Sequence, residues 1–361
     1  MTVAPVTTTI IKKEVTTIKT TPVTLIEGDG IGPEILDATL DVLNAMDTSF
    51  VWHRFKAGMR AYEETGDALP GEMLDNIRQT RLALKAPLTT PVGSGFRSAT
   101  VRLREEFVLF ANVRPARTYI HSPRNYDNID LVLIRENTEG LYVGVEHYIP
   151  IDGDPKAVAE ASGIITRSGC RRIAEFAFDY AVRNHRKKIT IVHKANILKA
   201  LTGLFLETAL EVGRKYEGRL EIEDRIVDNC AMQLVINPNQ FDVILTTNMF
   251  GDILSDEIAG LIGGLGLAPG GNIGRDTAIF EAIHGTAQDI AGKGIANPTS
   301  LLLASAMMLD HIREPELATR LRNAIRAVLV EDHIRTIDLG GDASTSTYTA
   351  AIIRRLQSDC A

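Results

Sequence analysis

The chain has 361 residues, of which 45% are hydrophobic and 24% are charged, and its formal net charge is −7 at pH 7. This composition is typical of a globular chain with one large or two smaller domains. The negative charge argues against a nucleic acid or an anionic membrane as the main partner, and no apolar run approaches the roughly 20 residues of a membrane span. Three widely spaced cysteines without a CxxC motif, Cys170, Cys230 and Cys360, disfavour disulfides and zinc and favour a cytoplasmic location.

The N-terminal segment, residues 1–20, is rich in threonine and contains neither an arginine nor a long apolar run. It is therefore unlike a transit peptide or a secretory signal. Its β-branched residues could add an edge strand to a sheet or remain a loose arm, and the sequence leaves both open.

A strand, a glycine-rich turn and a helix start open the main body of the chain. Residues 23–27 are apolar and β-branched, and the sequence GDGIGP follows at 28–33. Because the spacing is not GxGxxG, a tight turn is favoured over a phosphate-binding loop. Helix patterns at 38–43 and 72–80 and a strand pattern at 82–85 then predict an α/β fold with a parallel or mixed sheet.

Arginines are frequent in the next part of the chain. The segment TTPVGSG at 89–95 breaks regular structure, and five arginines follow it. We expect buried strands at 107–113 and 130–134, which would end at Arg114 and Arg135. Scattered surface arginines are the alternative, but arginines at strand ends converge easily on one cleft, where guanidinium groups bind carboxylates with two hydrogen bonds. The pattern predicts a substrate with several carboxylates.

An apolar run at 241–247 predicts a buried strand that leads into a helix beginning near Asp252. Asp252 and Asp256 share one side of this helix with Ala259 and Gly263. The opposite side is apolar and consists of Leu254, Ile258, Leu261 and Leu265. A solvated acidic face would continue with charged residues, whereas small residues let a ligand approach closely.

Two carboxylates four residues apart beside such a surface predict a site for a hard cation. Mg²⁺ and Mn²⁺ prefer carboxylate oxygens, and water and substrate oxygens complete their coordination. Asp252 and Asp256 are the expected ligands, and Asp228, in the preceding sequence VDN, is the expected third ligand.

Six longer motifs complete the pattern and occur in a fixed order along the chain. They are ENTEGLY at 136–142, VHKANIL at 192–198, DNCAMQLV at 228–235, GDILSD at 251–256, GGLGLAPGGNIG at 263–274 and EAIHGTAQDIAGKGIANPT at 281–299. With them the chain resembles the metal-dependent β-decarboxylating dehydrogenases, which comprise isocitrate, 3-isopropylmalate, homoisocitrate and tartrate dehydrogenases. The match runs from about Val23 to the C-terminus.

The resemblance implies the isocitrate/isopropylmalate dehydrogenase-like α/β fold, which is not the usual Rossmann fold. It implies a large domain with the NAD site from residues 1–110 and 264–361, and a small domain with the dimer interface from residues 111–263. A clasp segment is expected at 140–168. The resemblance further implies a homodimer or a higher homo-oligomer with shared active sites, in which Asp228 and Lys194 serve the neighbouring subunit.

The resemblance also implies roles for single residues. Tyr142 and Lys194 would be the acid/base pair. The residues expected to bind the tricarboxylate substrate are Thr90, Ser98, Thr100, Arg104, Arg114 and Arg135. The chemistry agrees with these roles: a lysine can take the proton of a 2-hydroxyl group while hydride leaves for the nicotinamide, a metal stabilises the enolate after loss of CO₂, and a tyrosine protonates C3.

NAD is the expected cofactor. The adenosine-binding loop would consist of His284, Gly285, Thr286 and Ala287. Asp289 and Ile290 stand where the similar NADP-using isocitrate enzymes carry Lys and Tyr. A carboxylate accepts hydrogen bonds from ribose hydroxyls and repels a 2′-phosphate, although Asp289 could instead cap a helix. Asn297 is expected at the adenine and Asp338 at the adenosine end.

These features together predict an NAD-dependent isocitrate dehydrogenase that requires Mg²⁺ or Mn²⁺ and forms 2-oxoglutarate and CO₂. The sequence around Ser98 favours a γ-carboxylate, whereas Thr100 replaces an asparagine common in isocitrate enzymes and keeps homoisocitrate, or 3-isopropylmalate, as an alternative substrate. A non-catalytic regulatory subunit of a hetero-oligomer is the alternative of another class. The presence of Tyr142, Lys194 and all three aspartates argues against it.

Overall fold

The computed structural model describes residues 20–46, 48–91, 96–120 and 126–358. The N-terminal arm and residues 92–95 of the predicted loop therefore lie outside the described residues, as does Cys360. Cys170 and Cys230 are buried free thiols. In the described ranges, no helix is both long and apolar enough to cross a membrane.

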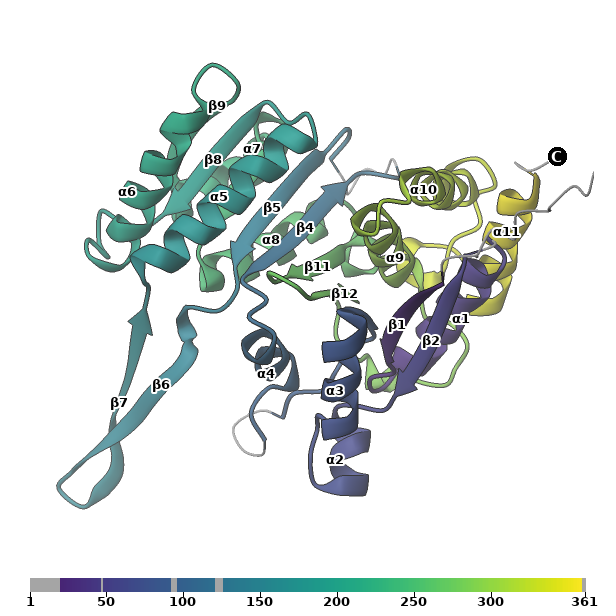
Figure 1. Cartoon of the computed structure of the whole chain (residues 1–361), viewed down its shortest axis with the longest axis horizontal. Coiled ribbons are helices and arrows are strands. Elements are labelled where there is room, and N and C mark those ends of the chain that lie inside the picture. Colours follow the sequence, from purple (N-terminus) through teal and green to yellow (C-terminus); the bar gives the residue numbers. More distant parts are fainter. Residues whose placement is uncertain (1–19, 47, 92–95, 121–125, 359–361) are drawn as a thin grey trace, which may run out of the picture.

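A ten-stranded mixed sheet runs through the molecule in the order β2-β1-β3-β12-β11-β4-β5-β10-β8-β9 (Figure 1). Neighbouring strands are parallel except at β12–β11, β11–β4 and β4–β5. The strands are β1 (Thr21–Ile26), β2 (Phe50–Phe55), β3 (Leu82–Lys85), β4 (Ala111–Arg117), β5 (Asp130–Glu136), β8 (Lys188–His193), β9 (Glu221–Ile226), β10 (Val243–Thr246), β11 (Pro269–Ile273) and β12 (Ala278–Ala282). The expected α/β class is confirmed.

The strand order divides the sheet by origin in the sequence. Strands β1, β2 and β3 from the start of the chain lie with β11 and β12 from its last third, whereas β4, β5, β8, β9 and β10 all come from residues 111–246. Both ends of the chain therefore build one half of the sheet, and the middle builds the other half.

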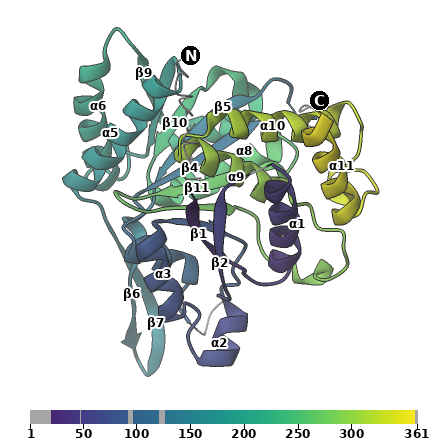
Figure 2. The same ribbon diagram turned by 45° about the vertical axis from the view of Figure 1, so that its right-hand side comes forward.

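Helices cover both faces of the sheet. Figure 2 shows α5 and α6 at one end of the molecule and α1 and α11 at the other. The helices are α1 (Gly32–Asn44), α2 (Met59–Thr65), α3 (Gly71–Thr80), α4 (Ala99–Glu106), α5 (Arg167–Arg183), α6 (Leu201–Gly213), α7 (Val227–Ile236), α8 (Asn248–Leu261), α9 (Thr299–His311), α10 (Pro315–Val330) and α11 (Thr345–Ser358). Helix α9 is apolar almost all round because it is buried between the sheet and α10.

A separate antiparallel hairpin, β6 (Gly140–Ile151) and β7 (Asp154–Ile164), projects from the body (Figure 1). Most of its residues are exposed. Its exposed large apolar side chains include Leu141, Val145, Tyr148, Ile149, Ile151, Val158 and Ile164. An isolated two-stranded hairpin is marginally stable in water. The hairpin lies within the segment predicted as a clasp, whose role stays a prediction.

Two predicted element boundaries are wrong. The strand predicted at 107–113 begins only at Ala111, because α4 continues to Glu106 and the chain then turns through Val108, whose φ is 46°. The strand then continues to Arg117, so Arg114 lies in the middle of it and does not close it.

The helix predicted to begin near Asp252 begins at Asn248, directly after strand β10. The residues from Asn248 to Gly251 form the first turn of this helix, and only Thr247 separates them from β10. The helix ends at Leu261, so Leu265 falls in the following 3₁₀ turn and Gly263 lies beyond the helix. Ala259 is buried and does not extend the open surface beside the two aspartates.

Candidate active site

Arginines on β4 and β5 point to one face of the sheet, where α8 lies. Side chains alternate along a strand, and the antiparallel register pairs Arg114 with Leu133 and Asn112 with Arg135. We call the face that carries α8 the front face of these strands, and the opposite face the back face. Arg114 and Arg135 are both buried, and the side chain of Arg135 is only 1% exposed.

Residues in the first turns of α8 hold the Arg135 side chain in one position. Asn248 Oδ1 accepts hydrogen bonds from Arg135 Nε at 3.0 Å and from Nη2 at 2.7 Å, and Nη1 forms an ion pair with Asp252. A Cβ atom on Gly251 would lie 2.6 Å from Arg135 Cγ, so glycine is required for the guanidinium stem to pass. The amide of Asn248 also donates to Glu139 O at 3.0 Å, which ties the start of the hairpin to α8.

Asp252 and Asp256 lie together beside the buried arginines. Arg114 Nη1 is 3.2 Å from Asp256 Oδ1, and its Nη2 is 3.6 Å from Asp252 Oδ1. The Tyr142 hydroxyl donates to Asp252 Oδ2 at 2.5 Å. The structure thus brings five of the predicted residues together: two substrate arginines, two metal ligands and the catalytic tyrosine.

The pKa values follow from this arrangement. Although burial opposes its ionisation, the Arg135 guanidinium, the Tyr142 hydroxyl and the other arginines hold the pKa of Asp252 below its usual range. Burial raises the pKa of Asp256, only partly offset by Arg114. Burial and the bond to Asp252 raise the pKa of Tyr142, so its hydroxyl keeps its proton at neutral pH.

A network of buried charged residues connects β3, β12 and α4, and the sequence analysis did not predict it. Glu281 on β12 forms an ion pair with Lys85 on β3 at 2.6 Å, and Arg104 Nη2 is 3.8 Å from its carboxylate. Glu281 Oε1 also accepts a hydrogen bond from Asn272 at 2.7 Å, and Asn272 in turn bonds Asn112. The sequence did contain a signal for this network, since each of two otherwise apolar strands carries one charged residue, Lys85 in LALK and Glu281 in AIFEA.

Arg104, on α4, points toward the Glu281 carboxylate. Burial lowers its pKa, and its buried Nε has no hydrogen-bond partner among the described residues. Ser98 caps the same helix by accepting from Val101 N at 3.4 Å, and it accepts from Thr90 Oγ1 at 3.2 Å. Thr100 lies one turn before Arg104 on α4, so the four predicted substrate residues of this region are neighbours.

Lys194 and Asp228 form a separate pair. Lys194 Nζ lies 2.5 Å from Asp228 Oδ1, and this contact lowers the pKa of Asp228. In the part of the chain that the structure describes, no three acidic, histidine or cysteine side chains are grouped to hold a metal ion. One chain alone therefore does not bring Asp228 to Asp252 and Asp256.

The predicted cofactor loop follows β12. Burial lowers the pKa of His284, and its buried Nε2 has no hydrogen-bond partner within the described ranges. Asp289 is exposed and lies inside a 3₁₀ turn over Gln288–Ile290, not at the start of a helix that it could cap. Asn297 Nδ2 donates to Asp338 Oδ2 at 2.9 Å, which joins the two residues expected near the adenosine.

The glycine-rich turn after β1 packs against the predicted cofactor loop at Thr286. Ile31 N donates to Thr286 O at 2.9 Å, and a Cβ atom on Gly30 would lie 2.0 Å from the same oxygen. The Asp29 carboxylate is occupied by backbone N–H groups of Met59, Arg60 and Thr89. An already satisfied carboxylate in this position agrees with a tight structural turn.

The residues present fit the groups that the sequence implies. The carboxylates of Asp252 and Asp256 offer oxygen ligands of the kind that Mg²⁺ and Mn²⁺ prefer. The Nε2 atom of His284, unpartnered within the described ranges, offers a hydrogen bond to a ligand in the cofactor loop.

Comparison with known proteins identifies the family of the chain. The family described as isocitrate/isopropylmalate dehydrogenase matches residues 22–352. A crystal structure of isocitrate dehydrogenase from Methylococcus capsulatus is 51% identical, with a TM-score of 0.90 over 93% of this chain and 99% of that chain. The fold class expected from the sequence is thereby confirmed.

Two relatives carry different names at similar identity. The isocitrate/homoisocitrate dehydrogenase of Thermus thermophilus is 47% identical over 337 residues, which are 92% of this chain and 98% of the relative. A mitochondrial protein of Dictyostelium discoideum, named as a regulatory subunit of NAD isocitrate dehydrogenase, is 44% identical over 341 residues, which are 94% and 93% of the two chains.

Proposed function

The chain belongs to the isocitrate/isopropylmalate dehydrogenase family, and we propose that it catalyses the NAD-dependent oxidative decarboxylation of isocitrate to 2-oxoglutarate and CO₂. The observation that carries this proposal is the convergence of buried Arg104, Arg114 and Arg135 beside the Tyr142–Asp252 pair. Three guanidinium groups in one buried site match a tricarboxylate better than a monocarboxylate.

In this proposal the arginines bind and orient the carboxylates of the substrate. Asn248 and Asp252 fix Arg135, and Asn112 Oδ1 fixes Arg114 by accepting a 2.7 Å hydrogen bond from its Nε. Guanidinium groups fixed in this way lose little freedom when the substrate binds. Ser98 and Thr100 are the residues proposed to meet the remaining carboxylate.

Asp252 and Asp256, with Asp228 of a second subunit, are proposed to hold Mg²⁺ or Mn²⁺. The bound metal supplies Lewis acidity that stabilises the negative charge formed at C3 and C2 when CO₂ leaves. Tyr142 keeps its proton at neutral pH and donates it to C3. The neutral amine of Lys194 is proposed to accept the proton of the C2 hydroxyl, and the Asp228 carboxylate then pairs with the ammonium group that forms.

NAD is the proposed hydride acceptor. It would supply an electrophilic nicotinamide, and His284 and Asn297 are the residues proposed to bind its adenosine half. The exposed carboxylate of Asp289 can accept hydrogen bonds from ribose hydroxyls and repels a 2′-phosphate.

Steady-state kinetics test the reaction directly. The chain is assayed with isocitrate, homoisocitrate and 3-isopropylmalate, each with NAD and with NADP, in the presence of Mg²⁺ or Mn²⁺. We expect the highest kcat/KM for isocitrate with NAD. A higher kcat/KM for homoisocitrate would transfer the proposal to that substrate, for which the name of the Thermus thermophilus relative gives specific support.

A regulatory role is the second candidate, since one similar protein bears that name. The chain purified alone separates the two candidates, because a regulatory chain would bind ligands without turnover. Activity in the absence of any other chain is expected, since Tyr142, Lys194 and the three aspartates are all present.

We propose that two copies of the chain share their active sites. Helices α7 and α8 expose a group of large apolar side chains, Met232, Val235, Ile236 and Ile253. Surfaces of this kind commonly mark interfaces between subunits. The proposed clasp is the segment 140–168, which contains the projecting hairpin. The proposed large domain consists of residues 1–110 and 264–361, and the proposed small domain of residues 111–263.

Subunit mixing tests the shared site. Tyr142→Phe and Lys194→Met are each expected to be inactive, and joint refolding of the two variants should restore about a quarter of wild-type activity, since half of the dimers are hybrids with one intact site. No recovery in hybrids verified by mass spectrometry would contradict sharing. Fractionation of the source cells tests the predicted cytoplasmic location.

A further inference from the structure

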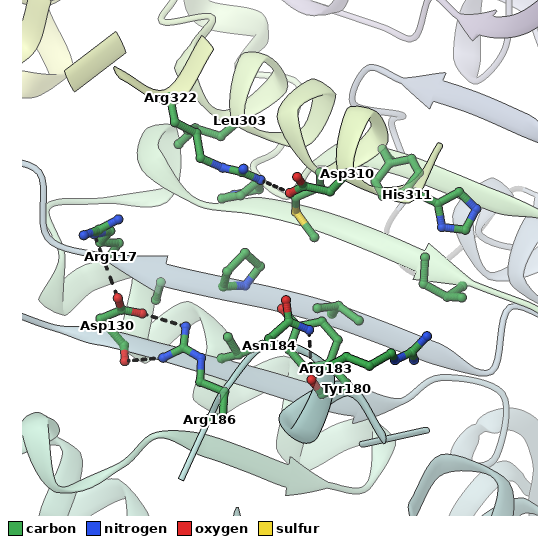
Figure 3. A pocket seen from close by; sticks show the side chains of 18 of the residues that line it. Arg117, Asp130, Tyr180, Arg183, Asn184, Arg186, Leu303, Asp310, His311 and Arg322 are labelled. Carbon is green, nitrogen blue, oxygen red and sulfur yellow. Dashed lines mark hydrogen bonds and ion pairs between the residues drawn. The ribbon is translucent and has the colours of Figure 1, made fainter. Parts of the chain in front are cut away.

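A groove of about 570 Å³ lies on the back face of β4 and β5, away from the candidate active site. Val113 and Pro115 line it, whereas Arg114 between them points to the front; likewise Val132 lines it and Arg135 does not. Its walls are α5 on one side and α9 with α10 on the other (Figure 3). The volume is that of a typical small-molecule site.

The floor and walls of the groove are suited to a flat apolar body. Phe176 and Tyr180 stack with their ring centroids 6.3 Å apart on one wall. Leu303 and Met307 from α9 and Phe280 from β12 also line the groove. Aromatic rings and a flexible methionine together accommodate planar ligands.

The polar groups of the groove favour an anion. Four arginines and two aspartates line it, which leaves two positive charges in excess, although the whole chain is negative. Arg322 pairs with Asp310, and Arg186 pairs with Asp130 at 2.6 Å. Within the described residues, Arg183 has no carboxylate partner and bonds only the backbone oxygen of Asp179.

Two further polar side chains in the groove lack partners in the described part of the chain. The hydroxyl of Tyr180 forms no hydrogen bond to a described residue, and burial raises its pKa, so it stays a donor. His311, on the opposite wall, contacts Phe280 edge-on, and its ring nitrogens bond no residue in the described ranges. Figure 3 shows Tyr180 and Arg183 on one wall and His311 on the other.

We propose that this back-face groove binds a planar aromatic carboxylate, with the ring between Tyr180 and Met307 and the carboxylate on Arg183. An arginine without a carboxylate partner binds such a group through two charge-assisted hydrogen bonds. The site is independent of the reaction proposed for the front face.

The test uses two probes of the same shape, 2-naphthoate and its neutral isostere 2-naphthamide. Titration calorimetry with the full-length protein should show binding of one naphthoate per chain and at least about tenfold weaker binding of the amide. Arg183→Gln should weaken naphthoate binding about tenfold and leave amide binding unchanged. Tyr180→Phe, which keeps the ring, should weaken naphthoate binding by a smaller factor.

Arg171→Gln is the matched control, because Arg171 lies on the same helix, pairs with Glu211 and does not line the groove. It should leave both affinities unchanged. The proposal is overturned if naphthoate does not bind, if it binds Arg183→Gln as tightly as wild type, or if both arginine variants weaken it equally. The middle outcome would place the probe elsewhere, for example on the front arginines.

Discussion

The two faces of β4 and β5 use arginine in opposite settings. On the front face, Arg114 and Arg135 are buried, held by Asn112 and Asn248, and paired with aspartates of α8. On the back face, Arg183 is exposed and Arg322 is paired near the surface. The same cation is fixed and buried on one face and open to solvent on the other.

This difference shows how the fold keeps two arginines buried. Buried arginines are costly unless they are compensated, and the front face supplies the compensation through Asp252, Asp256 and Glu281. Exposed pairs on the back face contribute little to stability, so these residues are freer to serve binding. Substitutions on the front face should therefore have larger effects than those on the back face.

Glu281→Gln should have the largest effect, because it leaves Lys85 and Arg104 buried without their carboxylate. Removal of one partner of a buried ion pair costs about 3–5 kcal/mol of the free energy of unfolding. Urea unfolding at pH 7 measures this loss. The exposed Glu221→Gln, on β9, is the control and should change the free energy of unfolding by less than about 0.5 kcal/mol.

The same variant should change the response to acid. Although burial opposes ionisation, Lys85 and Arg104 lower the pKa of Glu281 to about 2. A carboxylate with a lowered pKa stabilises the fold above its unfolded pKa of about 4.3, and this contribution is lost as the pH falls through the folded pKa. Wild type should lose this part of its stability between these pH values. An equal pH dependence in Glu281→Gln would contradict the assignment.

Asp252→Asn should have the next largest effect. It removes a ligand charge from the proposed metal site and the carboxylate that pairs with Arg135, so kcat/KM should fall on the order of a hundredfold. Initial rates over a series of Mg²⁺ concentrations should also show a higher half-saturation concentration. Asp276→Asn, in an exposed turn, should leave both values unchanged; an unchanged metal dependence in Asp252→Asn would refute its role as a ligand.

The double variant Asp289→Lys with Ile290→Tyr tests whether these two residues set the preference for NAD over NADP. Removal of the carboxylate and addition of a cation should shift the ratio of kcat/KM for NADP over NAD by about ten- to a hundredfold. Comparison of the two cofactors under one set of conditions measures the ratio. If the ratio stays constant, the cofactor preference lies in other residues.

Arg322→Gln should have the smallest effect, because Arg322 and Asp310 are 32% and 44% exposed. The loss in the free energy of unfolding should be at most about 1 kcal/mol, as for other surface ion pairs. A loss comparable to that of Glu281→Gln, measured by the same urea titration, would break the contrast between the two faces.

Local signals in the sequence predicted much of the site. The strand at 82–85 is found at its predicted bounds, and Tyr142, Asp252 and Arg135 meet as their motifs indicated. The sequence predicts Arg114 at a strand end because the apolar run stops at Val113, whereas β4 continues to Arg117. The turn at Val108 also moves the start of the strand, and a positive φ at a β-branched residue cannot be predicted from propensity.

The remaining contacts of the site could not be predicted without the order of the strands in the sheet. Lys85 and Glu281 are far apart in the sequence and meet only because β3 and β12 are adjacent and parallel. In the sequence Asn248 resembles an ordinary residue at a helix start, and only the structure shows that its side chain accepts hydrogen bonds from Arg135. The back-face groove has no motif at all, because its walls come from α5, α9 and α10.

The strand order also has a consequence for synthesis on the ribosome. Strands β4, β5, β8, β9 and β10 can pair as soon as residues 111–246 have emerged. Strand β3 must wait for β12, nearly two hundred residues later, before its second edge is covered. A nascent chain that stops before Pro269 therefore has two partial sheets, each with an open strand edge, at β3 and at β4, and these edges are where a chaperone would bind.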